Sequence, residues 1–127
     1  GLPSSSKIEM SVQASHLLIK HQGSRRPASW KDETGAEITK RTKDDAIKTL
    51  MAHRDVITAD ANPAQKFGEL AAIHSDCSSA RQKGDLGPFG RGQMQKPFED
   101  ATFALKVGEI SGMIDTDSGV HIILRTA

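Results

Sequence analysis

The order of hydrophobic patterns along the chain constrains the fold more than any other feature. Residues 12–21 alternate with period two, so that Leu17 and Ile19 would face one side of a strand while His16 faces the other. Helical patterns fill the middle of the chain, and residues 113–117 and 120–125 predict a hairpin near its end. A strand, then helices, then strands predict an α+β fold with helices packed around a sheet.

Three helices are expected between these strands. The first begins after the N-cap Thr42 and reaches about Ile57, and the second begins after the N-cap Asn62 and ends near Asp76. The third begins near residue 95 or 96 and stops before Gly108. A short helical turn is also expected over residues 78–83.

The same patterns set the domain boundaries. Residues 1–11 lack a periodic apolar pattern and are expected to be a flexible lead-in, whereas residues 12–127 have the size of one domain. Within that domain, residues 22–40 are rich in glycine and charge and predict a long exposed loop. Loops of this length in compact domains are usually functional or disordered.

Charge and cysteine usage narrow the possible functions. With 17 Lys+Arg against 16 Asp+Glu the net charge is +1, so no strong field favours nucleic acid or a membrane, and a basic site must be local. No apolar run has the length of a membrane span, and no signal peptide is recognisable. The single cysteine, Cys77, excludes an intrachain disulfide and suits a reducing compartment, so we expect an intracellular protein of the cytoplasm, the nucleus or both.

Lys20, Arg25 and Arg26 form a local basic cluster at the expected end of the first strand. Their charge-assisted hydrogen bonds would suit a dianionic phosphate. A solvated basic loop is the competing interpretation and, from the residues alone, the more common one. RNA binding is less favoured because aromatic residues make up only 4% of the chain and no stacking platform surrounds the cluster.

Two histidines and the cysteine are candidates for catalysis. His16 and His121 fall on one face of the expected sheet, where their imidazoles could meet across neighbouring strands. A purely structural role is the alternative for each histidine. A cysteine hydrolase would need a base beside Cys77, and the adjacent Asp76 disfavours a reactive thiolate. The histidines and Cys77 show no recognised metal-ligand spacing, so no metal is expected.

A glycine-rich segment follows the second expected helix. Residues 84–92 contain four glycines, but their spacing matches neither a Walker loop nor a dinucleotide fingerprint. Leu86, Met94 and Phe98 lie in or just after this segment, and from the residues alone they are equally compatible with core packing.

Six segments taken together resemble one family. They are residues 14–21 (ASHLLIKH), 23–27 (GSRRP), 75–80 (SDCSSA), 84–87 (GDLG), 90–99 (GRGQMQKPFE) and 116–123 (TDSGVHII). In this order they resemble the phosphorylation-directed parvulins, which are peptidyl-prolyl cis–trans isomerases, and the resemblance extends over residues 14–127. The Arg-Arg pair separates this subgroup from other parvulins.

The resemblance implies a fold, an activity and a set of partners. The fold would be a four-stranded antiparallel sheet surrounded by about four helices. The protein would be a monomeric isomerase that acts, without a cofactor, on proteins phosphorylated on Ser or Thr before Pro, with no nucleic-acid or membrane partner. The alternative is a module that binds phospho-Ser/Thr-Pro without catalysis.

The resemblance also implies roles for individual residues. Phosphate binding would fall to the cations Lys20, Arg25 and Arg26. The catalytic centre would comprise His16, Cys77, Thr116, Ser118 and His121. The proline pocket and the contact with the substrate backbone would come from Leu86, Met94, Gln95 and Phe98. Residues 31–37, after Trp30, form a longer loop than in family members with a WW module, and no WW module is expected in this chain.

Overall fold

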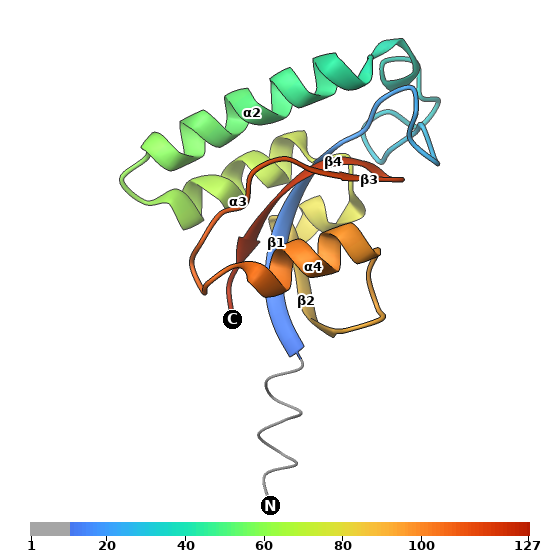
Figure 1. Cartoon of the computed structure of the whole chain (residues 1–127). Helices are drawn as coiled ribbons and strands as arrows, with labels where there is room; N and C mark the ends of the chain where they lie inside the picture. Colours follow the sequence, from blue (N-terminus) through green and yellow to red (C-terminus); the bar gives the residue numbers. More distant parts are fainter. Residues whose placement is uncertain (1–10) are drawn as a thin grey trace, which may run out of the picture.

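Four antiparallel strands form one sheet in the order β2-β1-β4-β3 in the computed structural model, which describes residues 11–127 (Figure 1). The strands are β1 (Ser11–Ile19), β2 (Asp85–Gly90), β3 (Ile114–Thr116) and β4 (Gly119–Arg125). The first and last strands lie side by side in the middle of the sheet, so the two ends of the described chain form its centre. The expected flexible lead-in lies outside the described residues except for Ser11, which opens β1.

Three α-helices and two 3₁₀ turns accompany the sheet in the described residues, which confirms the expected α+β fold. They are α2 (Lys43–Ala59), α3 (Pro63–His74), α4 (Lys96–Ala104), η1 (Ile38–Lys40) and η2 (Ser78–Gln82). The expected caps are confirmed, because the side chain of Thr42 accepts the Asp45 N–H and that of Asn62 accepts the Gln65 N–H. The expected third helix is confirmed as α4, and the expected turn over residues 78–83 is confirmed as η2.

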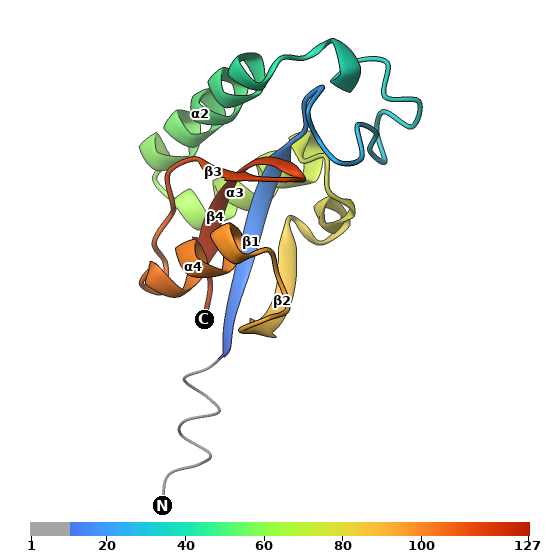
Figure 2. The same ribbon diagram turned by 45° about the vertical axis from the view of Figure 1, so that its right-hand side comes forward.

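Both faces of the sheet are covered, and the alternation along β1 and β4 decides which side chains each face receives. Leu17, Ile19 and Ile122 pack with Leu50 and Phe67, on the face that α2 and α3 cover. The opposite face lies against α4 (Figures 1 and 2). There, the buried set consists of Val12, Ala14, Phe89, Phe98 and Ile123. His16 and His121 belong to this second face, as the alternation predicts.

The glycine-rich segment forms a strand that the residues themselves did not predict. β2 contains Pro88 and two glycines, which weaken or break strands in the centre of a sheet. Pro88 is tolerated because β2 lies at the edge of the sheet. A residue without a backbone N–H can there face the side that has no neighbouring strand. Gly84, just before β2, is also required, since a Cβ there would lie 2.4 Å from the carbonyl oxygen of His16.

The expectation of an exposed loop over residues 22–40 is wrong in part. Ile38 is completely buried, and η1 follows from two backbone N–H groups, of Glu37 and Ile38, that donate to the carboxylate of Asp32. Ser29 and Asp32 exchange a pair of backbone hydrogen bonds. The segment is therefore an ordered structure built by its own polar groups around one aliphatic side chain.

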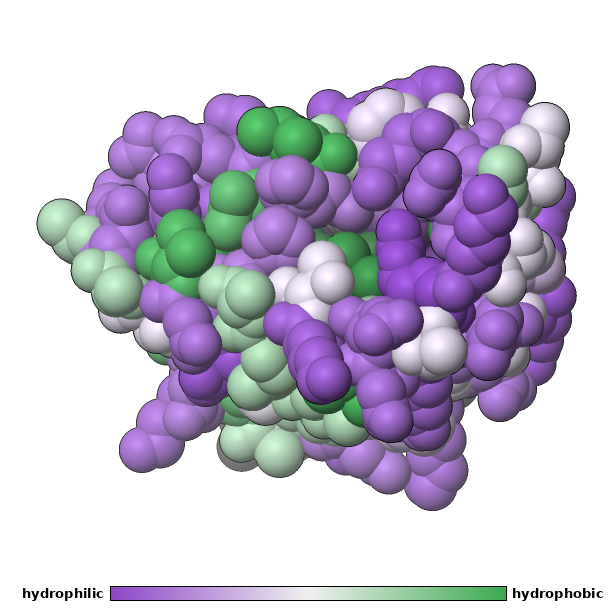
Figure 3. Space-filling view, turned by 90° about the horizontal axis from the view of Figure 1, so that it is seen from above, coloured by the Kyte–Doolittle hydropathy of each residue, from purple (hydrophilic) through white to green (hydrophobic). Residues whose placement is uncertain are grey.

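The outer surface agrees with the composition. No helix in the described residues is long and apolar enough to cross a membrane. The face that carries α2 is mostly hydrophilic, with small separate groups of hydrophobic side chains (Figure 3).

Candidate active site

Two buried histidines meet on the face of the sheet that α4 covers. His16 lies on β1, and His121 on β4 pairs with Leu18, two residues further along β1. The Nδ1 atoms of His16 and His121 are 3.0 Å apart, and the rings stack with centroids separated by 5.2 Å. The edge-on ring of Phe98 contacts both imidazoles. The prediction that these rings meet across adjacent strands is confirmed.

Hydroxyl groups hold the outer nitrogens of the pair. His16 Nε2 lies 3.2 Å from Ser79 Oγ, and His121 Nε2 lies 2.7 Å from Thr116 Oγ1. Thr116 Oγ1 also accepts the backbone N–H of Ser118 at 3.2 Å. A continuous series of hydrogen bonds thus runs from η2 to the hairpin that carries Ser118, through Ser79, His16, His121 and Thr116. Sequence reasoning gave Ser79 no role, although it lies within the SDCSSA segment.

Burial keeps both imidazoles neutral near pH 7. It lowers the pKa of His16 from 6.5 to about 4. Burial, followed by the influence of His16, also lowers the pKa of His121 well below its ordinary value. The Nδ1–Nδ1 hydrogen bond needs one nitrogen with a proton and one without, so a doubly charged pair would lose it. This environment favours a hydrogen-bonding framework over a titrating acid and base.

An inner cavity of about 280 Å³ opens above the histidine pair. Its apolar wall is made by Leu86, Met94 and Phe98, and Cys77 and Ser118 stand at its border. The structure therefore brings together all the residues expected for a proline pocket. An apolar socket of this kind suits a pyrrolidine ring, which has no charge and no N–H to satisfy.

Gln95 also lines the inner cavity, and its amide is engaged within the protein. Its Nε2 donates to Ser118 Oγ at 2.8 Å, and its Oε1 accepts the backbone N–H of Asp117 at 3.1 Å. Gln95 therefore holds the hairpin in place. A contact with a substrate backbone would have to share or replace one of these bonds.

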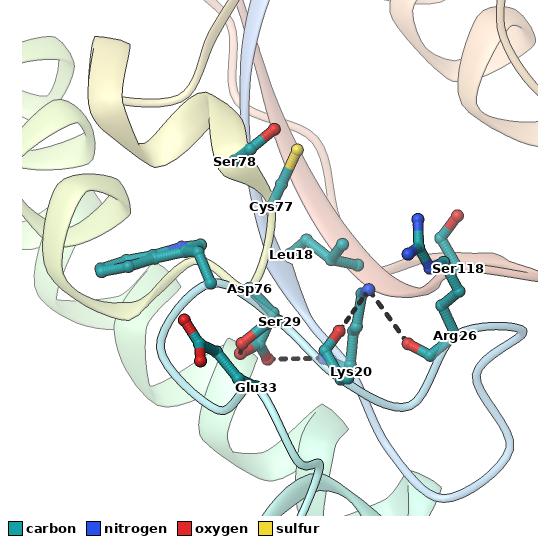
Figure 4. Close-up of a pocket in the computed structure, with 11 residues that line it drawn as sticks. Leu18, Lys20, Arg26, Ser29, Glu33, Asp76, Cys77, Ser78 and Ser118 are labelled. Carbon is teal, nitrogen blue, oxygen red and sulfur yellow. Dashed lines mark hydrogen bonds between the residues drawn. The ribbon is translucent and has the colours of Figure 1, made fainter.

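An outer cavity of about 460 Å³ adjoins the inner one, and both are lined by Cys77 and Ser118. Lys20 and Arg26 line the outer cavity (Figure 4). The Nζ of Lys20 donates to the carbonyl oxygens of Arg26 and Ala28, at 3.0 and 2.7 Å. These bonds tie the end of β1 to the loop, and the cations Lys20 and Arg26 both line the same cavity.

Asp76 supports the outer cavity from beneath. Its carboxylate is almost completely buried and accepts the Lys20 N–H at 2.9 Å and the Ser29 hydroxyl at 3.0 Å. The guanidinium of Arg41 lies 3.3 Å away and the ammonium of Lys31 3.6 Å away. Through these partners Asp76 joins β1, the loop and the Cys77 segment. Because Arg41 and Lys31 balance its negative charge, the carboxylate does not oppose an anion in the cavity.

Arg25 is placed differently from the other two expected phosphate ligands. Its guanidinium pairs with the Asp117 carboxylate at 2.7 Å, and its backbone N–H donates to the Asp117 carbonyl oxygen at 2.8 Å. It lines a separate cavity, together with Gln95 and Thr116. The structure brings Lys20 and Arg26 together, while Arg25 holds the basic loop against the hairpin.

Cys77 is half-buried at the boundary of the two cavities. Its sulfur accepts the Ser79 N–H at 3.5 Å, and the nitrogens of the histidine pair bond to each other and to hydroxyl groups. Among residues 11–127, no hydrogen bond joins the Cys77 thiol to an imidazole, so this part of the chain gives no support for a cysteine hydrolase. Within residues 11–127, no group of three or more His, Cys, Asp or Glu side chains could hold a metal ion.

Comparison with known proteins agrees with this geometry. The rotamase family model, the PPIC-type PPIase domain, matches residues 16–127. This chain belongs to the PPIC-type, or parvulin, family. A curated parvulin of Digitalis lanata, "Peptidyl-prolyl cis-trans isomerase Pin1", is 65% identical over 115 residues, which are 91% of this chain and 95% of the relative. The Arabidopsis thaliana relative of the same name is 62% identical over 117 residues, again 91% of this chain and 95% of the relative.

Solved parvulin structures have the same fold. The peptidyl-prolyl isomerase ESS1 from Candida albicans superposes with a TM-score of 0.83 at 48% identity, over 94% of this chain and 64% of that chain. The solution structure named TbPIN1 gives a TM-score of 0.80 at 45% identity, over 93% of this chain and 98% of that chain. The chain is therefore a peptidyl-prolyl cis–trans isomerase of the Pin type. The alternative of a binding module without catalysis is set aside.

Proposed function

We propose that this isomerase acts on the bond between a phosphorylated Ser or Thr and the following Pro. The observation that carries the proposal is the shared border of the two cavities at Cys77 and Ser118. A proline in the inner cavity would place the residue before it at this border. The side chain of that residue could then reach Lys20 and Arg26 in the outer cavity.

The charges of the outer cavity suit a phosphate. Lys20 and Arg26 would each give charge-assisted hydrogen bonds to a dianion, and such bonds contribute about 1.5–3 kcal/mol each. The carboxylate of Asp76, satisfied by its own partners, does not oppose this binding. The second pKa of a phosphate lies near 6, so the dianion predominates at neutral pH.

Catalysis requires stabilisation of the twisted amide. Rotation about an X–Pro bond meets a barrier of about 18–20 kcal/mol because it breaks amide resonance. The apolar socket of Leu86, Met94 and Phe98 would hold the ring while phosphate anchoring fixes the preceding residue, so that rotation is confined to one bond. No covalent intermediate and no cofactor are needed.

The polar border would match the charge redistribution in the transition state. Cys77 and Ser118 would present fixed dipoles and hydrogen-bonding groups beside the rotating carbonyl. Groups that are already oriented stabilise a transition state without reorganising. His16 and His121 would act indirectly, by orienting Thr116 and, through its backbone, Ser118.

We propose that the partners are proteins phosphorylated on the residue before a proline. The isomerase would act on them as a monomer, in the cytoplasm or the nucleus, because a lone cysteine such as Cys77 suits a reducing compartment. Exchange spectroscopy on matched phospho-Ser-Pro and Ser-Pro peptides tests the substrate class. We expect catalysed exchange at least tenfold more efficient, in kcat/KM, for the phosphorylated peptide. Equal efficiency for both peptides would show that the outer cavity does not select phosphate.

A further inference from the structure

The outer cavity extends beyond the two cations. Besides Lys20 and Arg26, its wall includes Trp30 and Glu33, and its volume of about 460 Å³ exceeds that of the cavity proposed for the proline ring. In the view of Figure 4, Arg26 and Glu33 lie on opposite sides of Lys20. Neither isomerisation nor phosphate binding gives Trp30 and Glu33 a role.

These two side chains are presented by an ordered loop. Two sets of hydrogen bonds hold the loop in place. Ser29 and Asp32 exchange a pair of backbone hydrogen bonds, and the Asp32 carboxylate caps η1. The indole N–H of Trp30 donates to the Ser75 carbonyl oxygen at 2.8 Å, yet 43% of the residue remains exposed. The ring is thus anchored at its polar edge, and part of its surface is left open.

The carboxylate of Glu33 is available for a ligand. Asp76, the other carboxylate of the outer cavity, is buried and satisfied by its four partners. Glu33, by contrast, makes no hydrogen bond or ion pair with any residue in the described range 11–127. An aromatic surface beside an unpaired carboxylate is complementary to a cation.

We propose that Trp30 and Glu33 form a subsite for a lysine or arginine side chain of the substrate, within three residues on the N-terminal side of the phosphorylated residue. This subsite rests on the proposed function, because proline in the inner cavity and phosphate at Lys20 and Arg26 fix the direction of the peptide. A bound phosphate also offsets the charges of Lys20 and Arg26, which would otherwise repel a second cation. An exposed ion pair and a cation–π contact each contribute modestly, so a correctly placed lysine should tighten binding about three- to tenfold.

Anisotropy titrations of labelled phospho-Ser-Pro peptides test the subsite. In each peptide one of the three positions before phosphoserine holds lysine, norleucine or glutamate, and each has an unphosphorylated counterpart. We expect lysine to lower Kd about three- to tenfold relative to norleucine at one position, and glutamate to raise it. Glu33→Gln should abolish most of this preference, and Glu33→Lys should reverse it in favour of glutamate. Glu37→Gln, on the same loop but outside the cavity wall, is the matched control and should keep it.

The two proposals can fail separately. Equal Kd values for lysine and norleucine at all three positions, with the preference for phosphate retained, would overturn the subsite and leave the proposed function in place. A lysine preference that Glu33→Gln does not reduce would also overturn it. Equal binding of phosphorylated and unphosphorylated peptides would overturn the proposed function whatever the lysine comparison shows.

Discussion

His16 and His121 share a hydrogen bond between their Nδ1 atoms, 3.0 Å long, across the two central strands of the sheet. The bond joins residues 105 positions apart and places two neutral imidazoles under the proposed proline pocket. Each ring uses its other nitrogen on a hydroxyl group, so both rings are held at two points. The pair is therefore suited to orienting the polar border of the site, and this role can be separated from proton transfer by experiment.

The pH dependence of activity distinguishes the two roles. Because burial lowers the pKa of His16 to about 4 and that of His121 well below its ordinary value, neither should titrate between pH 6 and 8. We expect kcat/KM for an unphosphorylated peptide to be flat over this range. For the phosphorylated peptide it should fall as the pH drops below about 6, where the substrate phosphate gains a proton. A step near pH 6.5 with both peptides would indicate general-base catalysis by a histidine.

The same pKa shift predicts how stability depends on pH. The unfolded chain protonates His16 near pH 6.5, whereas the folded chain does so only near pH 4. Unfolding therefore takes up a proton in this window, and the free energy of unfolding should fall as the pH drops from 6.5 to 4. The contribution of His16 is about 3 kcal/mol. Urea titrations at several pH values should show a smaller fall for His16→Asn than for the wild type; an unchanged fall would contradict a neutral, buried His16.

Arg25 and Arg26 should behave differently when replaced. Arg26 lines the outer cavity, so Arg26→Ala should lower kcat/KM about tenfold to a hundredfold for the phosphorylated peptide alone. Arg25 pairs with Asp117 in an exposed ion pair, and its backbone bond to Asp117 is kept when the side chain is removed. Arg25→Ala should therefore lower activity by no more than about fivefold, and equally on both peptides. Asp117→Asn is the matched variant and should reproduce the effect of Arg25→Ala. Selective loss of the phosphorylated substrate in Arg25→Ala would instead make Arg25 a phosphate ligand.

Glu99 should position the proline pocket from outside it. Its buried carboxylate accepts the Gly92 N–H and pairs with Arg91 at 2.9 Å, which holds the segment leading to Met94 and Gln95. Both partners also lower the pKa of Glu99, and the hydrogen bond from the Gly92 N–H has the larger effect. We expect Glu99→Ala to raise KM several-fold with a smaller change in kcat, and Glu99→Gln to recover part of the loss.

Asp100→Asn is the control for this prediction. Asp100 also pairs with Arg91, at 2.8 Å, whereas the Gly92 N–H donates to Glu99. Its replacement should leave KM close to the wild-type value. Similar increases in KM for Asp100→Asn and Glu99→Ala would mean that Arg91, and not the bond to Gly92, fixes the segment.

Local signals in the sequence determined much of the fold. The alternation in residues 12–21 placed Leu17 and His16 on opposite faces of the sheet, and Thr42 and Asn62 marked the starts of two helices. These features depend on neighbours within a few positions, so the residues carry them without reference to the rest of the chain. The family resemblance added the candidate residues of the site and the fourth strand.

Only the tertiary structure decided the features that depend on distant partners. β2 forms despite Pro88 because β1 offers it an edge, and Ile38 is buried although its surroundings in the sequence are polar. One basic cluster in the sequence contains Lys20, Arg25 and Arg26. In the structure Arg25 pairs with Asp117 and lines a separate cavity, while Lys20 and Arg26 line one cavity together. A sequence states which charges are close along the chain, whereas the packing of β1, the loop and the hairpin determines which of them face the same space.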